Sequence, residues 1–153
     1  MPSPRLPDSR RERVARQAEL RCEYCRSPSD CSASSFSVEH IEPRSRGGSD
    51  DDDNLAWSCM GCNDRKYTAV DAIDPVSGEV VPLFHPRKQV WAEHFLWAAD
   101  FTQIVGQSPT GRATVARLKL NRPELVKLRQ ILRIAGEHPP AGESGRQSES
   151  TMR

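Results

Sequence analysis

The chain has 153 residues, of which 36% are hydrophobic and 28% charged, and its formal net charge is +1. This length suits one domain with extensions and is short for two. The near-neutral charge excludes the strongly basic balance of many nucleic-acid-binding proteins, so any such surface must be local. No apolar run approaches the roughly 20 residues of a membrane span, and no apolar signal segment opens the chain. We therefore expect a soluble, cytoplasmic protein without a membrane partner.

The first predicted elements are a helix and a hairpin. Residues 1–8 contain three prolines and should be flexible, whereas residues 9–18 predict a short helix. For the arginines of this helix we favour a solvated face over phosphate contacts: Arg10, Arg11, Arg13 and Arg16. Residues 36–41 predict a strand that pairs with a second strand over residues 54–58, and a helix should follow over residues 60–70.

A second group of elements forms a predicted extension. A turn signal within residues 71–85 separates two apolar segments and predicts a second hairpin. Residues 86–99 predict a helix that places Trp91 and Phe95 in the core, and residues 100–105 a strand. His85 and His94 lie in this region and are expected to be packed or hydrogen-bonded.

Two helices should complete the domain, over residues 110–120 and 123–135, the second capped by Asn121. Its apolar stripe comprises Leu125, Leu128, Leu132 and Ala135. Residues 110–133 hold seven Lys or Arg against one acidic residue, which leaves open a DNA-backbone surface or a basic face that balances acidic residues elsewhere. Residues 136–153 are poor in apolar residues and should be disordered.

Four of the five cysteines have the spacing of metal ligands. They form the pairs Cys22-x2-Cys25 and Cys59-x2-Cys62, which are separated by 33 residues. This pattern indicates a tetrahedral Zn²⁺ with four thiolates at about 2.3 Å, rather than disulfides. Four thiolates fill the coordination shell, so the predicted zinc is structural and contributes to folding. Cys31 is expected to remain a free thiol.

Between the hairpin strands lies an irregular connection, residues 42–53, of a length that points to a functional role. It ends in four aspartates. An EF-hand is excluded, because counting from Asp50 places Leu55 at the glycine position and Gly61 at the final glutamate position. We interpret the aspartates as a solvated acidic turn.

Glu39, His40 and Asn63 are the candidates for chemistry. Oxygen ligands suit a hard divalent cation such as Mg²⁺, which keeps waters for exchange with phosphate oxygens. Neighbouring side chains on a strand point to opposite faces, so Glu39 and His40 converge only if the strand breaks around them. Pro43 makes such a break plausible.

The stretch VEHIEPRSRGG followed by DNLAWSCMGCNDRK resembles the HNH endonucleases, in particular their branch with a four-cysteine zinc site. The resemblance spans about residues 22–70. It implies an α+β fold with a small ββα-metal, treble-clef-like nuclease core at 22–70, inside a domain at 9–135 that adds an N-terminal helix and a hairpin and helical extension at 71–135. The implied activity is metal-dependent hydrolysis of phosphodiester bonds in DNA, leaving 3'-hydroxyl and 5'-phosphate ends.

The same resemblance implies the roles of single residues. His40 would be the general base that activates water, Asn54 would hold the hairpin loop and the base in position, and Glu39 with Asn63 would bind the catalytic Mg²⁺ or Mn²⁺ beside His40. Lys66 would either add charge stabilisation or be an exposed helix lysine. Glu39 stands where aspartate is usual and Asn63 where the last histidine of the family name stands, so metal affinity should be modest.

A non-catalytic treble-clef zinc module that binds nucleic acid or protein is the alternative. It explains the cysteines equally well. It does not explain why His40, Asn54 and Asn63 all fall at the spacing of the nucleases.

Overall fold

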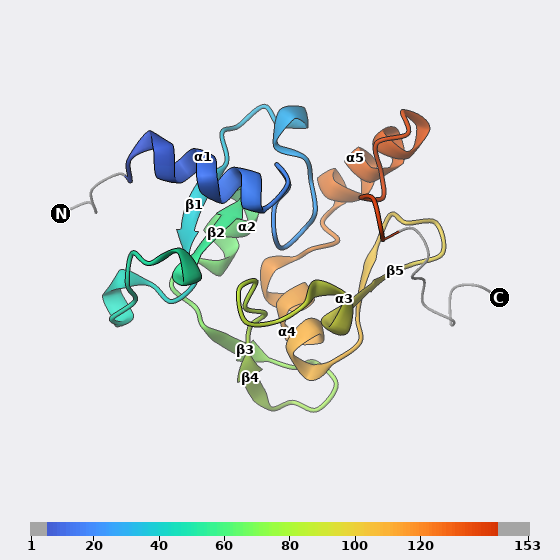
Figure 1. Cartoon of the computed structure of the whole chain (residues 1–153). Coiled ribbons are helices and arrows are strands. Elements are labelled where there is room, and N and C mark those ends of the chain that lie inside the picture. The colour runs from blue at the N-terminus through green and yellow to red at the C-terminus, as the bar shows by residue number, and fades with distance from the viewer. Residues whose placement is uncertain (1–5, 144–153) are drawn as a thin grey trace.

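The computed structural model describes residues 6–143, which fold into short helices and three separate two-stranded antiparallel sheets (Figure 1). The helices are α1 (Asp8–Gln17), α2 (Met60–Lys66), α3 (Trp91–His94), α4 (Pro109–Leu118) and α5 (Pro123–Ile134), with 3-10 turns η1 (Ser29–Cys31), η2 (Arg44–Arg46) and η3 (Asp52–Asn54). The strands are β1 (Ser37–His40), β2 (Leu55–Ser58), β3 (Asp71–Ile73), β4 (Val80–Pro82), β5 (Phe95–Trp97) and β6 (Ile104–Gly106). The predicted α+β class is confirmed. None of the described helices has the length and apolar character needed to cross a membrane.

The hairpin of β1 and β2 is the centre of the N-terminal half. Its register pairs Val38 with Trp57, Glu39 with Ala56 and His40 with Leu55. Helix α1 lies across this hairpin, and α2 follows β2 directly (Figure 1). The sequence prediction of two strands and a helix in this order is confirmed. The loop between the strands leaves the hairpin at its His40–Leu55 end, whereas α2 begins beyond Ser58 at the opposite end. The helix runs back along the hairpin, so that its last residue, Lys66, reaches the carbonyl of Ile41.

Helix α2 is shorter than predicted. It ends at Lys66, because Tyr67 adopts a left-handed backbone conformation with φ of 50°. The predicted helix over residues 60–70 is therefore wrong for its last turn. Beyond Tyr67 the chain enters the β3–β4 hairpin, where Ala72 pairs with Val81, as predicted from the turn signal.

The predicted helix over residues 86–99 is wrong except for α3. Phe95 and Trp97 are fully buried on either side of the half-buried Leu96, which is the alternation of a strand, and β5 pairs with β6. Trp91 and Phe95 do belong to the core, with ring centroids 5.0 Å apart. The predicted strand over residues 100–105 begins only at Ile104, since the Asp100 side chain organises a turn before it.

The last two helices agree with prediction, but their details differ. Asn121 does not cap α5; its side chain accepts from the backbone N–H of Ile104 (2.6 Å) and donates to the carbonyl of Ile104 (2.8 Å). The buried side of α5 includes Arg129, which is 2% exposed, whereas Ala135 of the predicted stripe is exposed. A guanidinium thus replaces part of the expected apolar stripe.

Residues 136–143, the beginning of the predicted tail, pack against the domain. The ring of His138 is buried and donates through Nε2 to the carbonyl of Phe101 (2.7 Å). It also packs edge to face against the ring of Trp97, with the ring centroids 4.6 Å apart. The rest of the predicted tail, residues 144–153, and residues 1–5 of the predicted flexible N-terminus lie outside the described residues.

Burial lowers the pKa of His138 from 6.5 to about 4. In the unfolded chain the imidazole takes up a proton near pH 6.5, so the free energy of unfolding should fall as pH drops from 6.5 towards 4. The loss should be on the order of 2 kcal/mol and should shrink in His138→Gln. Urea unfolding of both proteins at pH 7 and pH 5 measures it; an identical pH dependence would contradict the prediction.

Candidate active site and metal centre

The four paired cysteines converge on one point. The sulfur atoms of Cys22, Cys25, Cys59 and Cys62 all lie within 4.8 Å of one another, and all four residues are buried. The Cys25 and Cys59 sulfurs are 3.7 Å apart, close to the separation of about 3.8 Å that a tetrahedral zinc with 2.3 Å bonds requires. None of the four is in a disulfide. The donor set and its spacing therefore fit a structural zinc site, as predicted.

Backbone groups hold the thiols in place. The amide N–H of Cys25 donates to the Cys22 sulfur (3.5 Å), and the amide of Cys62 donates to the Cys59 sulfur (3.4 Å). The second contact also caps the start of α2, so the same cysteine begins the helix and belongs to the metal site. Cys31 is exposed and outside the cluster, in agreement with the expectation of a free thiol.

Two buried arginines from the C-terminal extension surround this cluster. Arg122 donates to the sulfurs of Cys59 (3.5 Å) and Cys62 (3.7 Å), and Arg129 donates to the backbone carbonyl of Cys25 (3.3 Å). Burial by itself would lower the pKa of Arg122, but the neighbouring thiolates, Cys62 foremost, raise it. A zinc ion with four thiolates carries a charge of −2, which the two guanidinium groups balance.

Replacing Arg122 by Met should therefore weaken zinc retention, because two sulfurs lose their charged donor while the side-chain volume is largely kept. We expect release of zinc to a colorimetric chelator to be about 10-fold faster or more. Lys127→Met, at an exposed residue of α5, is the matched control. Equal release rates for the two variants would contradict the prediction, and Cys59→Ser should abolish both zinc binding and folding.

Glu39 points into the protein. Its carboxylate accepts from Lys66 Nζ (2.5 Å) and Tyr24 Oη (2.6 Å), and all three side chains are buried. Lys66 also donates to the carbonyl of Ile41 (2.7 Å), so it ties α2 to the end of β1. Burial raises the pKa of Glu39, and the Lys66 ammonium opposes that shift. The interpretation of Lys66 as an exposed helix lysine is wrong, because its side chain is 1% exposed.

Removal of Lys66 should be costly. In Lys66→Met the Glu39 carboxylate would stay buried without its counter-charge, and breaking a buried pair in this way typically costs about 3–5 kcal/mol. Lys88→Met, at an exposed lysine, is the control. Thermal unfolding of the wild type and both variants measures the difference. Equal stability of Lys66→Met and Lys88→Met would refute the prediction.

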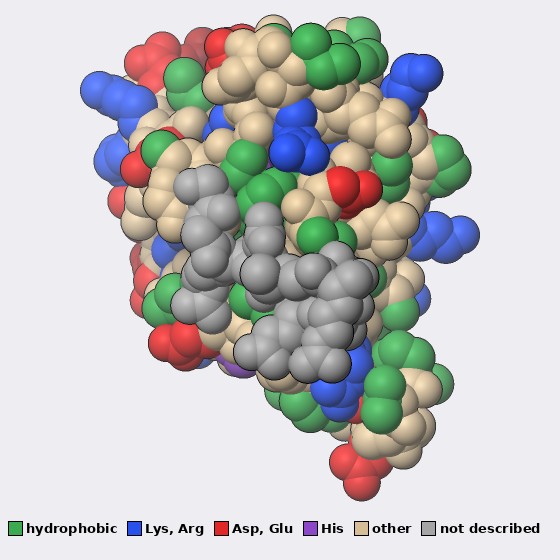
Figure 2. Space-filling view, turned by 90° about the vertical axis from the view of Figure 1, so that its right-hand side faces the viewer, with side chains coloured by type: hydrophobic (Ala, Val, Ile, Leu, Met, Phe, Trp, Pro, Cys, Tyr) green, Lys and Arg blue, Asp and Glu red, His purple; other side chains and the backbone are tan. Residues whose placement is uncertain are grey.

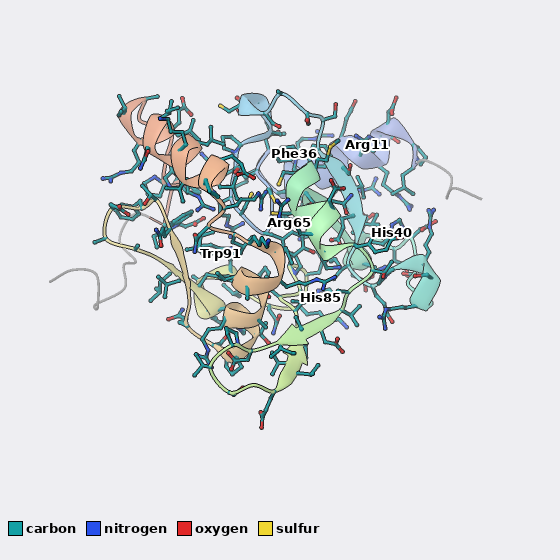
Figure 3. The ribbon with its side chains drawn as sticks, turned by 180° about the vertical axis from the view of Figure 1, so that it is seen from behind. Arg11, Phe36, His40, Arg65, His85 and Trp91 are labelled. Atoms are coloured by element: carbon teal, nitrogen blue, oxygen red, sulfur yellow. The ribbon has the colours of Figure 1, made fainter. Side chains whose placement is uncertain are left out.

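His40 points away from Glu39. Strand β1 stays regular through His40, whose backbone is paired with Leu55, so adjacent side chains leave on opposite faces. The break in the strand that would let Glu39 and His40 converge does not occur before His40. Figure 3 shows His40 at the end of the hairpin, beside the loop between the strands and on the side away from Trp91.

The contact that His40 does make was missed by sequence reasoning. Its Nε2 lies 2.8 Å from Oδ1 of Asp50. Arg44 donates to the same oxygen from Nε (2.9 Å), and its Nη2 forms an ion pair with that oxygen at 2.9 Å. The Arg44 guanidinium, followed by His40, lowers the pKa of Asp50 to about 2. Asp50 is the first of the four aspartates interpreted as a solvated acidic turn. In the sequence, only the loop that joins His40 to Asn54 hinted at this contact, and the residue spacing does not show which aspartate turns towards His40.

Asn54 fastens the loop between the strands. It is buried, its Oδ1 accepts from the amide of Glu42 (2.8 Å), and its Nδ2 donates to the carbonyls of Glu42 (3.0 Å) and Ser49 (2.8 Å). The loop closes tightly here: a Cβ atom on Gly48 would lie 1.8 Å from the carbonyl oxygen of Glu42. These contacts are what the predicted holding role of Asn54 requires.

Asn63 is the central residue of α2. It lies three residues before Lys66, and positions three apart share a face of a helix, so it belongs to the side of α2 that meets β1. Its side chain is half-buried. The described structure thus places Asn63 on the hairpin side, Glu39 inside and His40 at the loop.

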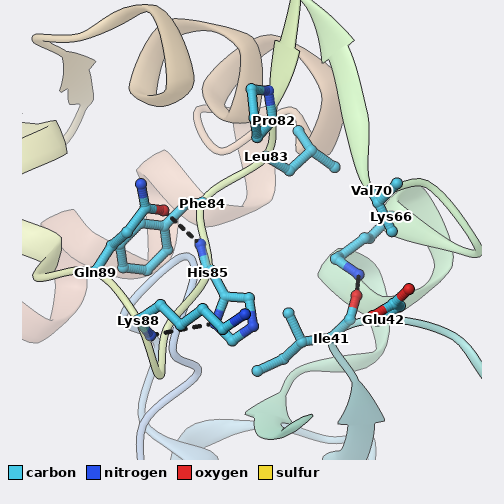
Figure 4. A pocket seen from close by; sticks show the side chains of 10 residues that line it. All are labelled: Ile41, Glu42, Lys66, Val70, Pro82, Leu83, Phe84, His85, Lys88 and Gln89. Atoms are coloured by element: carbon cyan, nitrogen blue, oxygen red, sulfur yellow. Dashed lines mark hydrogen bonds between the residues drawn. The ribbon is translucent and has the colours of Figure 1, made fainter. Parts of the chain in front are cut away.

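A cavity of about 340 Å³ lies where the hairpin and α2 meet the extension (Figure 4). Its lining includes Ile41, Lys66, Leu83 and His85, but not His40. The Nδ1 of His85 accepts from the amides of residues 87 and 88 at 3.2 Å each. This agrees with the expectation of a hydrogen-bonded His85. The cavity therefore lies beside Lys66, the partner of Glu39, and not beside His40.

Residues 22–69 match the sequence profile of the HNH endonucleases. This part of the chain is an HNH endonuclease domain. The matched segment runs from the first zinc ligand through the hairpin and α2, so it contains both the thiol cluster and the residues around His40. Neither a curated protein nor a solved structure matched the chain.

The basic residues outside the HNH segment mostly serve the fold. In α1, Arg10 donates to the carbonyl of Asp50 (2.6 Å), Arg13 holds Asp52 with two bonds of 2.9 Å, and Arg11 donates to the carbonyl of Phe36. The favoured interpretation of a purely solvated face is therefore incomplete.

The same holds for the basic segment of residues 110–133. Five of its seven basic residues have intramolecular partners: Arg112 with Asp74, Arg117 with the carbonyl of Arg65, Arg122 with the thiols, Arg129 with backbone carbonyls, and Arg133 with the carbonyl of Asp100. On the face seen in Figure 2, acidic and basic side chains are interspersed, and its visible part shows no continuous basic patch.

Proposed function

We propose that this protein is a metal-dependent endonuclease that hydrolyses phosphodiester bonds in DNA, with His40 as the general base. The observation that carries the proposal is the position of His40 within the HNH segment: its side chain is 18% exposed, at the end of a hairpin whose loop Asn54 holds in place. A partly exposed imidazole beside an ordered loop can reach a water molecule and still keep a defined orientation.

His40 would take the proton of the attacking water, and Asn54 would keep the loop and hence the base in position. The oxygen donors for a catalytic Mg²⁺ or Mn²⁺ would be Asn63 and Glu39. Both Glu39 oxygens already accept a hydrogen bond from a buried neighbour, so a cation would share the carboxylate with Lys66 and Tyr24. When bound, the cation supplies stabilisation of negative charge on the phosphate and the leaving oxygen.

For Lys66 we propose a structural role in place of the charge stabilisation of the phosphate that the sequence suggested. Its ammonium is buried against Glu39 and the carbonyl of Ile41. There it neutralises the carboxylate and sets the distance between α2 and β1. We therefore propose that Lys66 stabilises the structure of the site and does not contact the phosphate.

A non-catalytic zinc module that binds nucleic acid or protein is the second candidate. The specific observation in its favour is that the Glu39 carboxylate already accepts hydrogen bonds from Lys66 and Tyr24. Of the two proposed oxygen ligands of the cation, this leaves only the neutral Asn63 without such a commitment to Lys66 and Tyr24. Such a module would keep its zinc and its fold but would not cleave DNA.

Plasmid cleavage separates the two candidates. With Mg²⁺ or Mn²⁺, the wild type should convert supercoiled DNA to nicked or linear forms, and His40→Ala should reduce the rate at least about 100-fold because the general base is lost. Zinc content and circular dichroism of the variant should be unchanged, since His40 is outside the thiol cluster. Equal cleavage by His40→Ala would exclude His40 as the base, and no cleavage by the zinc-loaded wild type with any of these metals would favour the zinc module.

A further inference from the structure

One carboxylate connects His40 to the loop between the strands. Oδ1 of Asp50 is 2.8 Å from His40 Nε2, and it also accepts a hydrogen bond from Nε of Arg44 and forms an ion pair with its Nη2. An ionised carboxylate has no proton to donate, so the hydrogen in the contact with His40 belongs to Nε2. In neutral His40 this leaves the lone pair on Nδ1, the other ring nitrogen.

The backbone of Asp50 is held as firmly as its side chain. Arg10 of α1 donates to the carbonyl of Asp50 (2.6 Å), and Asn54 donates to the carbonyl of the preceding Ser49 (2.8 Å). Arg13 adds a two-bond contact to Asp52, two residues further along. Three elements, α1, η2 and η3, thus fix the place from which the carboxylate meets the imidazole.

We propose that Asp50 is the positioning residue of the base: it holds His40 in the tautomer with hydrogen on Nε2 and directs Nδ1 towards the attacking water. This inference rests on the proposed function, in which His40 accepts the water proton. A carboxylate on the far nitrogen orients the ring and stabilises the imidazolium that forms when the proton is transferred. Arg44, on the same oxygen, keeps the carboxylate ionised and fixes its rotamer.

The acidic run itself offers a control. Asp53 is exposed and belongs to the same four aspartates, and its change to Asn removes the same charge from the same loop. General effects of charge on DNA binding should therefore be common to Asp50→Asn and Asp53→Asn. Only Asp50→Asn also removes the negative charge from the group that accepts from His40, and Asp50→Ala removes the acceptor itself.

The test compares the full zinc-loaded chain with Asp50→Asn, Asp50→Ala and Asp53→Asn. We expect both Asp50 variants to lose about 10- to 100-fold in kcat for plasmid cleavage while KM for DNA changes less than about threefold. Asp53→Asn should stay within about twofold of wild type in kcat. Asp50 variants with wild-type kcat would overturn the proposal.

A second readout does not depend on cleavage. Nitrogen-15 NMR at pH 8 distinguishes the two neutral tautomers of histidine, and the signal of His40 is identified as the one missing in His40→Gln. His40 should be almost entirely the Nε2–H tautomer in wild type and Asp53→Asn, and a mixture in Asp50→Ala. An unchanged tautomer in Asp50→Ala would overturn the proposal. If the wild type does not cleave DNA but the tautomer depends on Asp50, the proposed function fails and the positioning contact stands.

Discussion

The four-thiol cluster is the constraint on which the rest of the structure depends. It joins a turn before the hairpin, at Cys22 and Cys25, to the start of α2, at Cys59 and Cys62, and therefore fixes where the helix begins relative to both strands. In a domain of this size a metal centre contributes folding energy that a small core does not supply. Arg122 and Arg129 extend this constraint to the C-terminal part of the chain, since both bury their charge beside the thiols. The extension is thus part of the surroundings of the metal centre.

The position of α2 determines which contacts the side chains on each face of β1 can make. Lys66 reaches from the last turn of α2 to Glu39 and to the carbonyl of Ile41, which commits the inner side of the strand to a buried ion pair. His40, on the other side, meets the loop instead, where Asp50 and Arg44 form an exposed polar group. The alternation of side chains along one strand thereby separates a buried stabilising contact from an accessible imidazole.

Most arginines within residues 6–143 make contacts inside the protein itself. Those of α1 hold the loop of Asp50 and Asp52, and Arg112 and Arg87 form paired contacts with the buried carboxylates of Asp74 and Glu23. Such pairs are expensive to break, because each would leave a buried charge without its partner. The high local count of basic residues therefore reflects the needs of the fold.

The sequence by itself determined the hairpin, the start of α2, the thiol cluster and the two C-terminal helices, because each depends on local spacing: alternating apolar residues, paired cysteines, and apolar positions three and four apart. Spacing could not decide residues 86–99, where aromatic residues suit both a helix and a strand until pairing with β6 selects the strand. It also could not show that Lys66 and Arg129 are buried or that Asp50 meets His40. Those contacts join groups from different elements, and only the tertiary structure sets their distance and their exposure to water.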